Sequence, residues 1–185
     1  IRGLVGSEMC IRDRYCADKP DLSAFVELHV EQGPVLDVER KDIGIVSGIV
    51  GQRRTHFSIL GQENHAGTTP MNMRDDALVK AASLVTYVND LATDEYDGLV
   101  ATVAEMNVSP NSFSVIPGQV DLTLQVRDLD AYNMDKFVDT VSKSFDLRYD
   151  IAHKSEPALC DPVLRHIIEE VSEEFGLSAV ELPSR

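Results

Sequence analysis

The sequence is poor in the features that mark nucleic-acid-binding and membrane proteins. Lys and Arg number 17 against 31 Asp and Glu, so the formal charge is −14 and no basic stripe is available to neutralise phosphates. No apolar run approaches the ~20 residues that a membrane span needs, and no secretory signal pattern is recognisable. We therefore expect neither nucleic acid nor membrane as a partner.

Cysteine is also scarce. Cys10, Cys16 and Cys160 are an odd number without metal-ligand spacing, which predicts free thiols in a reducing, cytoplasmic compartment rather than a disulfide framework. The apolar fraction of 43% and the charged fraction of 26% are ordinary for a soluble globular protein. At 185 residues, the chain is long enough for one large domain or for parts of two.

Residues 1–20 fit nothing that follows them. They show no sustained period, and the stretch SEMCIRDRY is similar to translated adapter sequence from sequencing reads. We expect residues 1–20 to be a non-native leader and exclude them from the fold. Residues 21–49 then contain an apolar run at 24–29 suited to a buried strand, a short helix at 34–40 and a glycine-punctuated strand at 43–50.

Residues 50–155 predict a β-α-β-β-α-β unit, in which two helices cover one face of an antiparallel sheet. The expected strands are 52–60, 99–108, 119–127 and 149–153, and the second helix is 131–145. The first helix has Asn72 as its expected N-cap. Its predicted apolar stripe consists of Leu78, Ala81, Ala82, Val85, Val88 and Leu91.

A third helix is predicted from Asp161 as N-cap and Pro162 at the first position. Its expected apolar stripe consists of Val163, Leu164, Ile167, Ile168, Val171 and Phe175. Residues 21–49 and 156–185 do not make a domain by themselves. We expect an α+β protein in which the unit at 50–155 is inserted into another domain formed by these flanking pieces.

Three residues are candidates for chemistry, each with an ordinary alternative. His29 ends a strand-like run between Glu27 and Glu31, where carboxylates could fix the ring of a metal ligand, but a lone histidine there is more often a satisfied core residue. His65 lies in a polar loop and could hold an oxyanion or be a simple exposed histidine. Arg127 ends a strand on the polar face, where it could bind a carboxylate or pair with Asp128 or Asp130.

Four stretches in order resemble one known family. ELHVEQGPVL at 27–36, GIVGQRR at 48–54, NHAGTTPMNMRDDAL at 64–78 and SVIPGQVDLTLQVRD at 114–128 are closely similar to the hydantoinase/carbamoylase family of amidases. Its members are allantoate amidohydrolase, N-carbamoyl-L-amino acid hydrolase and β-ureidopropionase, within the clan of aminoacylase-like dinuclear metallopeptidases. The resemblance covers about residues 22 to 185.

The resemblance implies an α/β catalytic domain that carries two divalent ions, zinc or manganese, and is interrupted by a ferredoxin-like lid that also forms a homodimer. It implies that His29 is a metal ligand, that Gln32 contacts the substrate and that Arg127 anchors the substrate carboxylate. His65 would stabilise the tetrahedral oxyanion, often in the site of the partner subunit. The implied substrate is a small carboxylate-bearing ureido or amide compound whose C–N bond is hydrolysed.

The sequence departs from the family pattern in two ways. Ser114 stands where the family has an asparagine that contacts substrate; serine reaches less far and lacks the paired donor and acceptor of an amide. The family's His-x-Asp, Glu-Glu and Gly-His-Asp motifs are not found in the sequence, so we expect an internal fragment that is inactive alone. The alternatives are a non-catalytic dimerisation or binding module and an aminoacylase or peptidase of the same clan.

Overall fold

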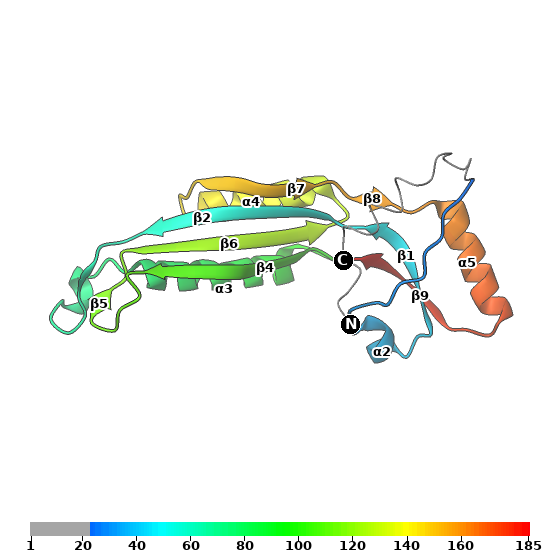
Figure 1. Ribbon diagram of the computed structural model, residues 1–185, viewed down its shortest axis with the longest axis horizontal. Coiled ribbons are helices and arrows are strands. Elements are labelled where there is room, and N and C mark those ends of the chain that lie inside the picture. Colours follow the sequence, from blue (N-terminus) through cyan, green and yellow to red (C-terminus); the bar gives the residue numbers. More distant parts are fainter. Residues whose placement is uncertain (1–22) are drawn as a thin grey trace, which may run out of the picture. The chain divides into compact units, whose positions relative to one another are not determined.

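The computed structural model describes residues 23–185, which fall into a segment ending at Gln32 and a larger unit beginning at Gly33 (Figure 1). The predictions for residues 1–20, Cys10 and Cys16 lie outside the described residues. Residues 23–32 contain neither helix nor strand, so the predicted strand at 24–29 is wrong. A strand must pair its backbone N–H and C=O groups with a neighbour, and this segment forms no ladder. Its apolar side chains are consequently exposed, with Leu28 at 94%.

The larger unit contains three helices of at least thirteen residues, a short helix, a 3-10 turn and nine strands. In chain order they are α2 (Val35–Glu39), β1 (Ile43–Ile49), β2 (Gly51–Leu60), β3 (Asn64–His65), η1 (Met71–Met73), α3 (Ala77–Glu95), β4 (Val100–Ser109), β5 (Val115–Ile116), β6 (Gln119–Asp128), α4 (Ala131–Ser144), β7 (Tyr149–Ser155), β8 (Ala158–Leu159), α5 (Pro162–Glu174) and β9 (Ala179–Ser184).

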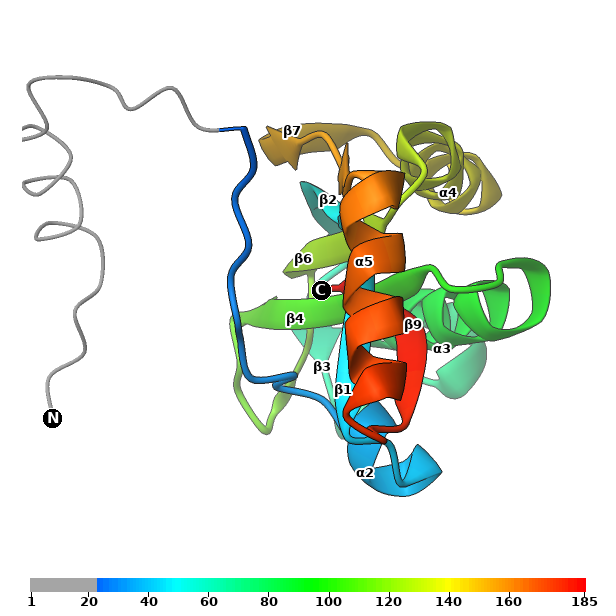
Figure 2. The ribbon, with the colours of Figure 1, turned by 90° about the vertical axis from the view of Figure 1, so that its right-hand side faces the viewer.

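The predicted β-α-β-β-α-β unit is confirmed. Strands β4, β6, β2 and β7 form an antiparallel sheet in that order, and α3 and α4 lie on the same side of it (Figure 2). Because side chains alternate along a strand, one face of β6 is apolar and its other face is polar. The apolar face packs against both helices in one core. This core includes Phe57, Ile59, Ala81, Leu84, Val88, Leu122, Leu124, Met134, Phe137 and Val141.

Helix α3 begins later than the sequence predicts. The carboxylate of Asp76 accepts hydrogen bonds from the backbone N–H groups of Leu78 and Val79, at 2.9 and 3.3 Å, and is the N-cap. Asn72 lies in the preceding η1 turn, so its prediction as N-cap is wrong. The predicted stripe is also partly wrong, because Leu78 and Ala82 are exposed. The buried residues of α3 are Ala77, Ala81, Leu84 and Val88.

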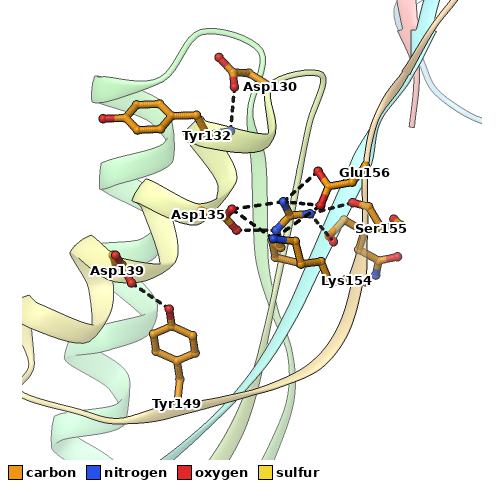
Figure 3. Close-up of polar contacts among 10 residues, drawn as sticks. Asp130, Tyr132, Asp135, Asp139, Tyr149, Lys154, Ser155 and Glu156 are labelled. Carbon is orange, nitrogen blue, oxygen red and sulfur yellow. Dashed lines mark hydrogen bonds and ion pairs between the residues drawn. The ribbon is translucent and has the colours of Figure 1, made fainter.

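Arg53 is the one charged side chain on the helix-covered face of β2 and is only 1% exposed. Its Nε donates to Asp135 Oδ1 at 2.5 Å, its Nη2 to Glu156 Oε1 at 3.2 Å and its Nη1 to the carbonyl of Ser155 at 2.7 Å. Figure 3 shows Asp135, Lys154 and Glu156 gathered at this point. The guanidinium therefore joins β2 to α4 and to the end of β7.

A second sheet has the order β8-β1-β9, with β1 parallel to β9 and antiparallel to β8. Asp161 caps α5 as predicted, with its carboxylate accepting from the N–H groups of Val163 and Leu164. The apolar stripe of α5 is only partly buried. Within the described residues, α5 packs mainly on the narrow β1 strand; Leu164 and Ile168 are half-buried, and Val163 and Phe175 are 65% and 76% exposed.

Candidate active site

His65 is held at the tip of a loop by short-range contacts. It forms the two-residue strand β3 with Asn64, and β3 pairs with β5 so that His65 lies opposite Val115. The carbonyl of His65 accepts from the N–H of Thr69 at 3.1 Å and from its hydroxyl at 2.8 Å. The imidazole itself is exposed. The backbone is therefore fixed while the ring faces outward.

A backbone contact also selects the tautomer of His65. The N–H of Gly67 donates to His65 Nδ1 at 3.1 Å. Because Nδ1 accepts this bond, the proton of the neutral imidazole belongs on Nε2. The exposed Nε2–H is then a donor, which is the group needed to hold an oxyanion. A Cβ at position 67 would approach His65 Cε1 to 3.2 Å, so a larger residue would push the ring aside by a few tenths of an ångström.

Arg74 braces the same loop; it lies in the stretch at 64–78 that resembles the family, although the resemblance implies no role for it. Its Nη2 donates to the carbonyl of Ala66 at 2.6 Å and its Nε to the carbonyl of Thr69 at 3.1 Å. Ser114 lies beside this loop, because its carbonyl accepts from the N–H of Ala66 at 2.9 Å. The structure therefore brings Ser114 and His65 together.

Arg127 occupies the opposite end of β6. It is half-buried on the polar face of the sheet, and its side chain makes neither a hydrogen bond nor an ion pair within residues 23–185. The alternative of a pair with Asp128 or Asp130 is not formed. The Asp128 carboxylate accepts from the N–H of Asp130, and the Asp130 carboxylate accepts from the N–H of Tyr132 at the start of α4 (Figure 3). The guanidinium of Arg127 is available for a ligand, and its role in carboxylate binding stays a prediction.

One chain does not bring His65 and Arg127 together. The nine residues from Gln119 to Arg127 extend over about 27 Å of β6, and the His65 loop lies beyond the Gln119 end (Figure 1). A small substrate cannot contact both side chains of the same chain at once. The resemblance implies that His65 often acts in the site of the partner subunit, which stays a prediction; within one chain the fold keeps His65 and Arg127 apart.

His29 and Gln32 belong to the first segment. His29 Nδ1 is 2.6 Å from the carbonyl oxygen of Val30, and both His29 and Gln32 are exposed. An Nδ1–H bonded to a carbonyl leaves Nε2 free as a metal ligand, so His29 by itself fits that role. A catalytic zinc needs about three protein ligands, and residues 23–185 contain no group of three or more potential ligands. The described residues alone do not fit a two-metal centre.

Comparison with known proteins identifies the domain that carries His65 and Arg127. A family model described as the peptidase dimerisation domain matches residues 47–151, which is more than half of the chain. The chain therefore contains a domain of this class.

Two relatives and one solved structure narrow the assignment. The chain is 45% identical over 122 residues to an N-carbamoyl-L-amino-acid amidohydrolase of Paenarthrobacter aurescens, covering 66% of this chain and 30% of the relative. It is 41% identical over 113 residues to the allantoate amidohydrolase of Escherichia coli K12, covering 61% and 28%. A crystal structure of a hydantoinase/carbamoylase family amidase from Burkholderia multivorans matches with a TM-score of 0.76 and 37% identity, covering 84% of this chain and 40% of that one. The chain belongs to the hydantoinase/carbamoylase family of amidases.

The alignments cover less than a third of the length of the two curated relatives. Within residues 23–185, none of the helices combines the length and the hydropathy of a bilayer-spanning segment.

Proposed function

We propose that this chain is part of a metal-dependent amidohydrolase that cleaves a C–N bond other than a peptide bond in a linear ureido or amide substrate. The observation that carries the proposal is the similarity to relatives named for hydrolysis of N-carbamoyl-L-amino acids and allantoate. The matched family model spans His65, Ser114 and Arg127. The proposed substrate is a small compound with a carboxylate, such as an N-carbamoyl amino acid or allantoate.

Within this proposal each side chain has a task that its environment supports. The unpaired guanidinium of Arg127 binds the substrate carboxylate, since its planar fork of donors matches two carboxylate oxygens. The Nε2–H of His65 donates to the oxygen that becomes negative as the C–N bond is attacked. Gln32 and Ser114 supply further polar contacts. His29 contributes one ligand to a pair of divalent ions, which would supply an activated water when bound.

The separation of His65 and Arg127 leads us to propose a site shared by two copies of the chain. The homodimer would form through the unit at 50–155, in keeping with the description of the matched family as a dimerisation domain. A two-fold arrangement places the same residues at both sites. His65 of one copy then completes the site that contains Arg127 of the other.

Mixing two inactive variants of the full-length protein tests the shared site. His65→Ala and Arg127→Gln should each be inactive alone, with His65→Ala retaining its metal. Unfolded and refolded together in equal amounts, they should recover about a quarter of wild-type activity, because half of the dimers are mixed and each mixed dimer has one intact site. Absence of recovery, with mixed dimers shown to be present, would contradict the shared site.

The reaction class is tested separately with the wild-type full-length protein. Ureido acids should be hydrolysed in preference to N-acyl amino acids, and His29→Ala should reduce bound metal measured by elemental analysis. Turnover of N-acyl amino acids alone would place the protein with aminoacylases. Normal metal content in His29→Ala would contradict the ligand assignment.

A further inference from the structure

The polar face of the sheet is divided by charge. We call the end of the sheet at Gly51 and Ser155 the hinge end and the end at Leu60 and Gln119 the far end. The pairing registers place eight residues in the two rows nearest the hinge end. These rows are Val100, Arg127, Gln52 and Ser155, followed by Thr102, Gln125, Arg54 and His153. Although the chain has 31 acidic residues, none of these eight positions is acidic.

Arg54 and Arg127 are neighbours in these rows. Arg127 lies opposite Gln52, and Arg54 is two residues further along β2, opposite Gln125. Residues in such a diagonal relation on one face are about 7–8 Å apart, within reach of long side chains. Arg54 is exposed, and its side chain, like that of Arg127, makes neither a hydrogen bond nor an ion pair within residues 23–185. Two adjacent positive charges are therefore left without an anion.

The two glutamines between the arginines supply further unused donors. Gln52 and Gln125 are half-buried, and the Nε2 of Gln52 is shielded from solvent without a hydrogen-bond partner in the described part of the chain. A shielded amide donor without a partner is costly. Arg53 differs, because its guanidinium on the opposite face is bound by two carboxylates and two carbonyls. Only the polar face leaves its arginines for an external ligand.

We propose that Arg54 is a second anion-binding residue at the acidic end of the substrate. Arg54, Arg127, Gln52 and Gln125 form one donor patch, which favours a ureido acid with two carboxylates over one with a single carboxylate. A single carboxylate is satisfied by one guanidinium fork, whereas a second carboxylate neutralises the second charge. The substrate preference rests on the proposed amidohydrolase function, and the anion-binding role of Arg54 does not.

The test compares Arg54→Gln and Arg127→Gln with Arg148→Gln in the full-length protein. Arg148 is an exposed arginine at the far end of the same unit and provides the matched loss of charge. Arg54→Gln should raise KM about tenfold or more for N-carbamoyl-aspartate, leave kcat unchanged and alter KM for N-carbamoyl-alanine little. Arg127→Gln should raise KM for both substrates, and Arg148→Gln for neither. Arg54→Lys should recover part of the affinity, because lysine keeps the charge and loses the fork.

Titration calorimetry with succinate tests the anion-binding role of Arg54 separately from the proposed amidohydrolase function. The wild-type protein should bind succinate more tightly than propionate, and Arg54→Gln should remove this preference even if no ureido acid is hydrolysed. An Arg54→Gln protein that binds succinate as Arg148→Gln does would overturn the role of Arg54. If Arg54→Gln changes the sedimentation coefficient but not the affinity for succinate, the patch is a contact between subunits. That result would also overturn the anion-binding role of Arg54.

Discussion

The tautomer and the position of the His65 ring depend on Gly67, a neighbour without a side chain. The N–H of Gly67 fixes which ring nitrogen carries the proton, and the missing Cβ of Gly67 leaves space for the ring. Arg74 holds the loop carbonyls in place. The histidine itself is recognisable from the sequence motif, but these contacts depend on the conformation of the loop.

We expect Gly67→Ala to lower kcat about tenfold, because the added Cβ displaces the imidazole and small misplacements of a reacting group are costly. At the 3.2 Å approach to His65 Cε1, the ring must move by a few tenths of an ångström to accommodate the Cβ. Gln62→Ala, an exposed side chain in the same loop, is the control. The measurement is steady-state kinetics of the full-length protein, alongside thermal unfolding. Unchanged kcat in Gly67→Ala would mean that the ring position is not set by this contact.

At the scale of elements, the buried Arg53 joins β2, α4 and the end of β7. Removing the two carboxylates that bind Arg53 should lower the free energy of unfolding more than removing the arginine. Asp135→Asn combined with Glu156→Gln leaves a buried charge without a counterion, which costs about 3–5 kcal/mol. Arg53→Met replaces that charge with an apolar chain and leaves two carboxylates that are 51% and 57% exposed. Urea unfolding of the wild type, the double variant and Arg53→Met measures their stabilities. An Arg53→Met protein less stable than the double variant would contradict this explanation.

The same contact predicts a dependence of stability on acid pH. The hydrogen bond from Arg53 holds the pKa of Asp135 below its ordinary value, despite some opposing burial. A lowered pKa in the folded state contributes stability above the unfolded pKa of ~3.9 and loses it as the pH falls through the folded pKa. Arg53→Met should therefore flatten the decline of unfolding free energy below about pH 4. The pKa of Asp121 is lowered independently by Gln119 and Ser58, so Asp121→Asn is a control that leaves the Arg53 contribution intact.

The sequence predicts an element well where its apolar residues recur regularly on one face. It predicts the start of an element poorly where more than one polar residue could be the N-cap. Strand β6 alternates so regularly that its core face is evident. The start of α3 is harder, because Asn72 and Asp76 are both good N-caps and only the structure shows that Asp76 accepts the two bonds. The run at 24–29 is apolar enough for a strand, but periodicity does not reveal whether a neighbouring strand is present.

At the scale of the whole molecule, the β-α-β-β-α-β unit has its own hydrophobic core. Gln52 lies opposite Ser155, so the chain enters and leaves this unit at adjacent points. We expect residues 50–156 to unfold cooperatively when produced alone. Phe137→Ala, at a fully buried position, should cost about 3–5 kcal/mol in the isolated unit. Circular dichroism during urea unfolding is the measurement, and a broad, non-cooperative transition would show that packing from outside the unit is required.

The distances between site residues across the whole unit cannot be predicted from the sequence motifs. Motif similarity assigns His65 and Arg127 to one reaction, and only the length of β6 shows that they are on opposite ends of the unit. Arg54 carries no motif-based assignment, because its relation to Arg127 depends on strand register.

The unequal distribution of charge on the polar face has a consequence for how fast a ligand arrives. A protein of charge −14 repels anions at long range, yet Arg54 and Arg127 lie at one end of the face while Glu105, Asp121 and Asp150 lie towards the other. This gradient directs an anionic ligand towards the hinge end during diffusional encounter. Because the Debye length shortens from ~30 Å at 0.01 M salt to ~8 Å at 0.15 M, added salt should weaken the repulsion by distant charges before it weakens the attraction of the arginines. The association rate should then rise at first with ionic strength and fall only at high salt.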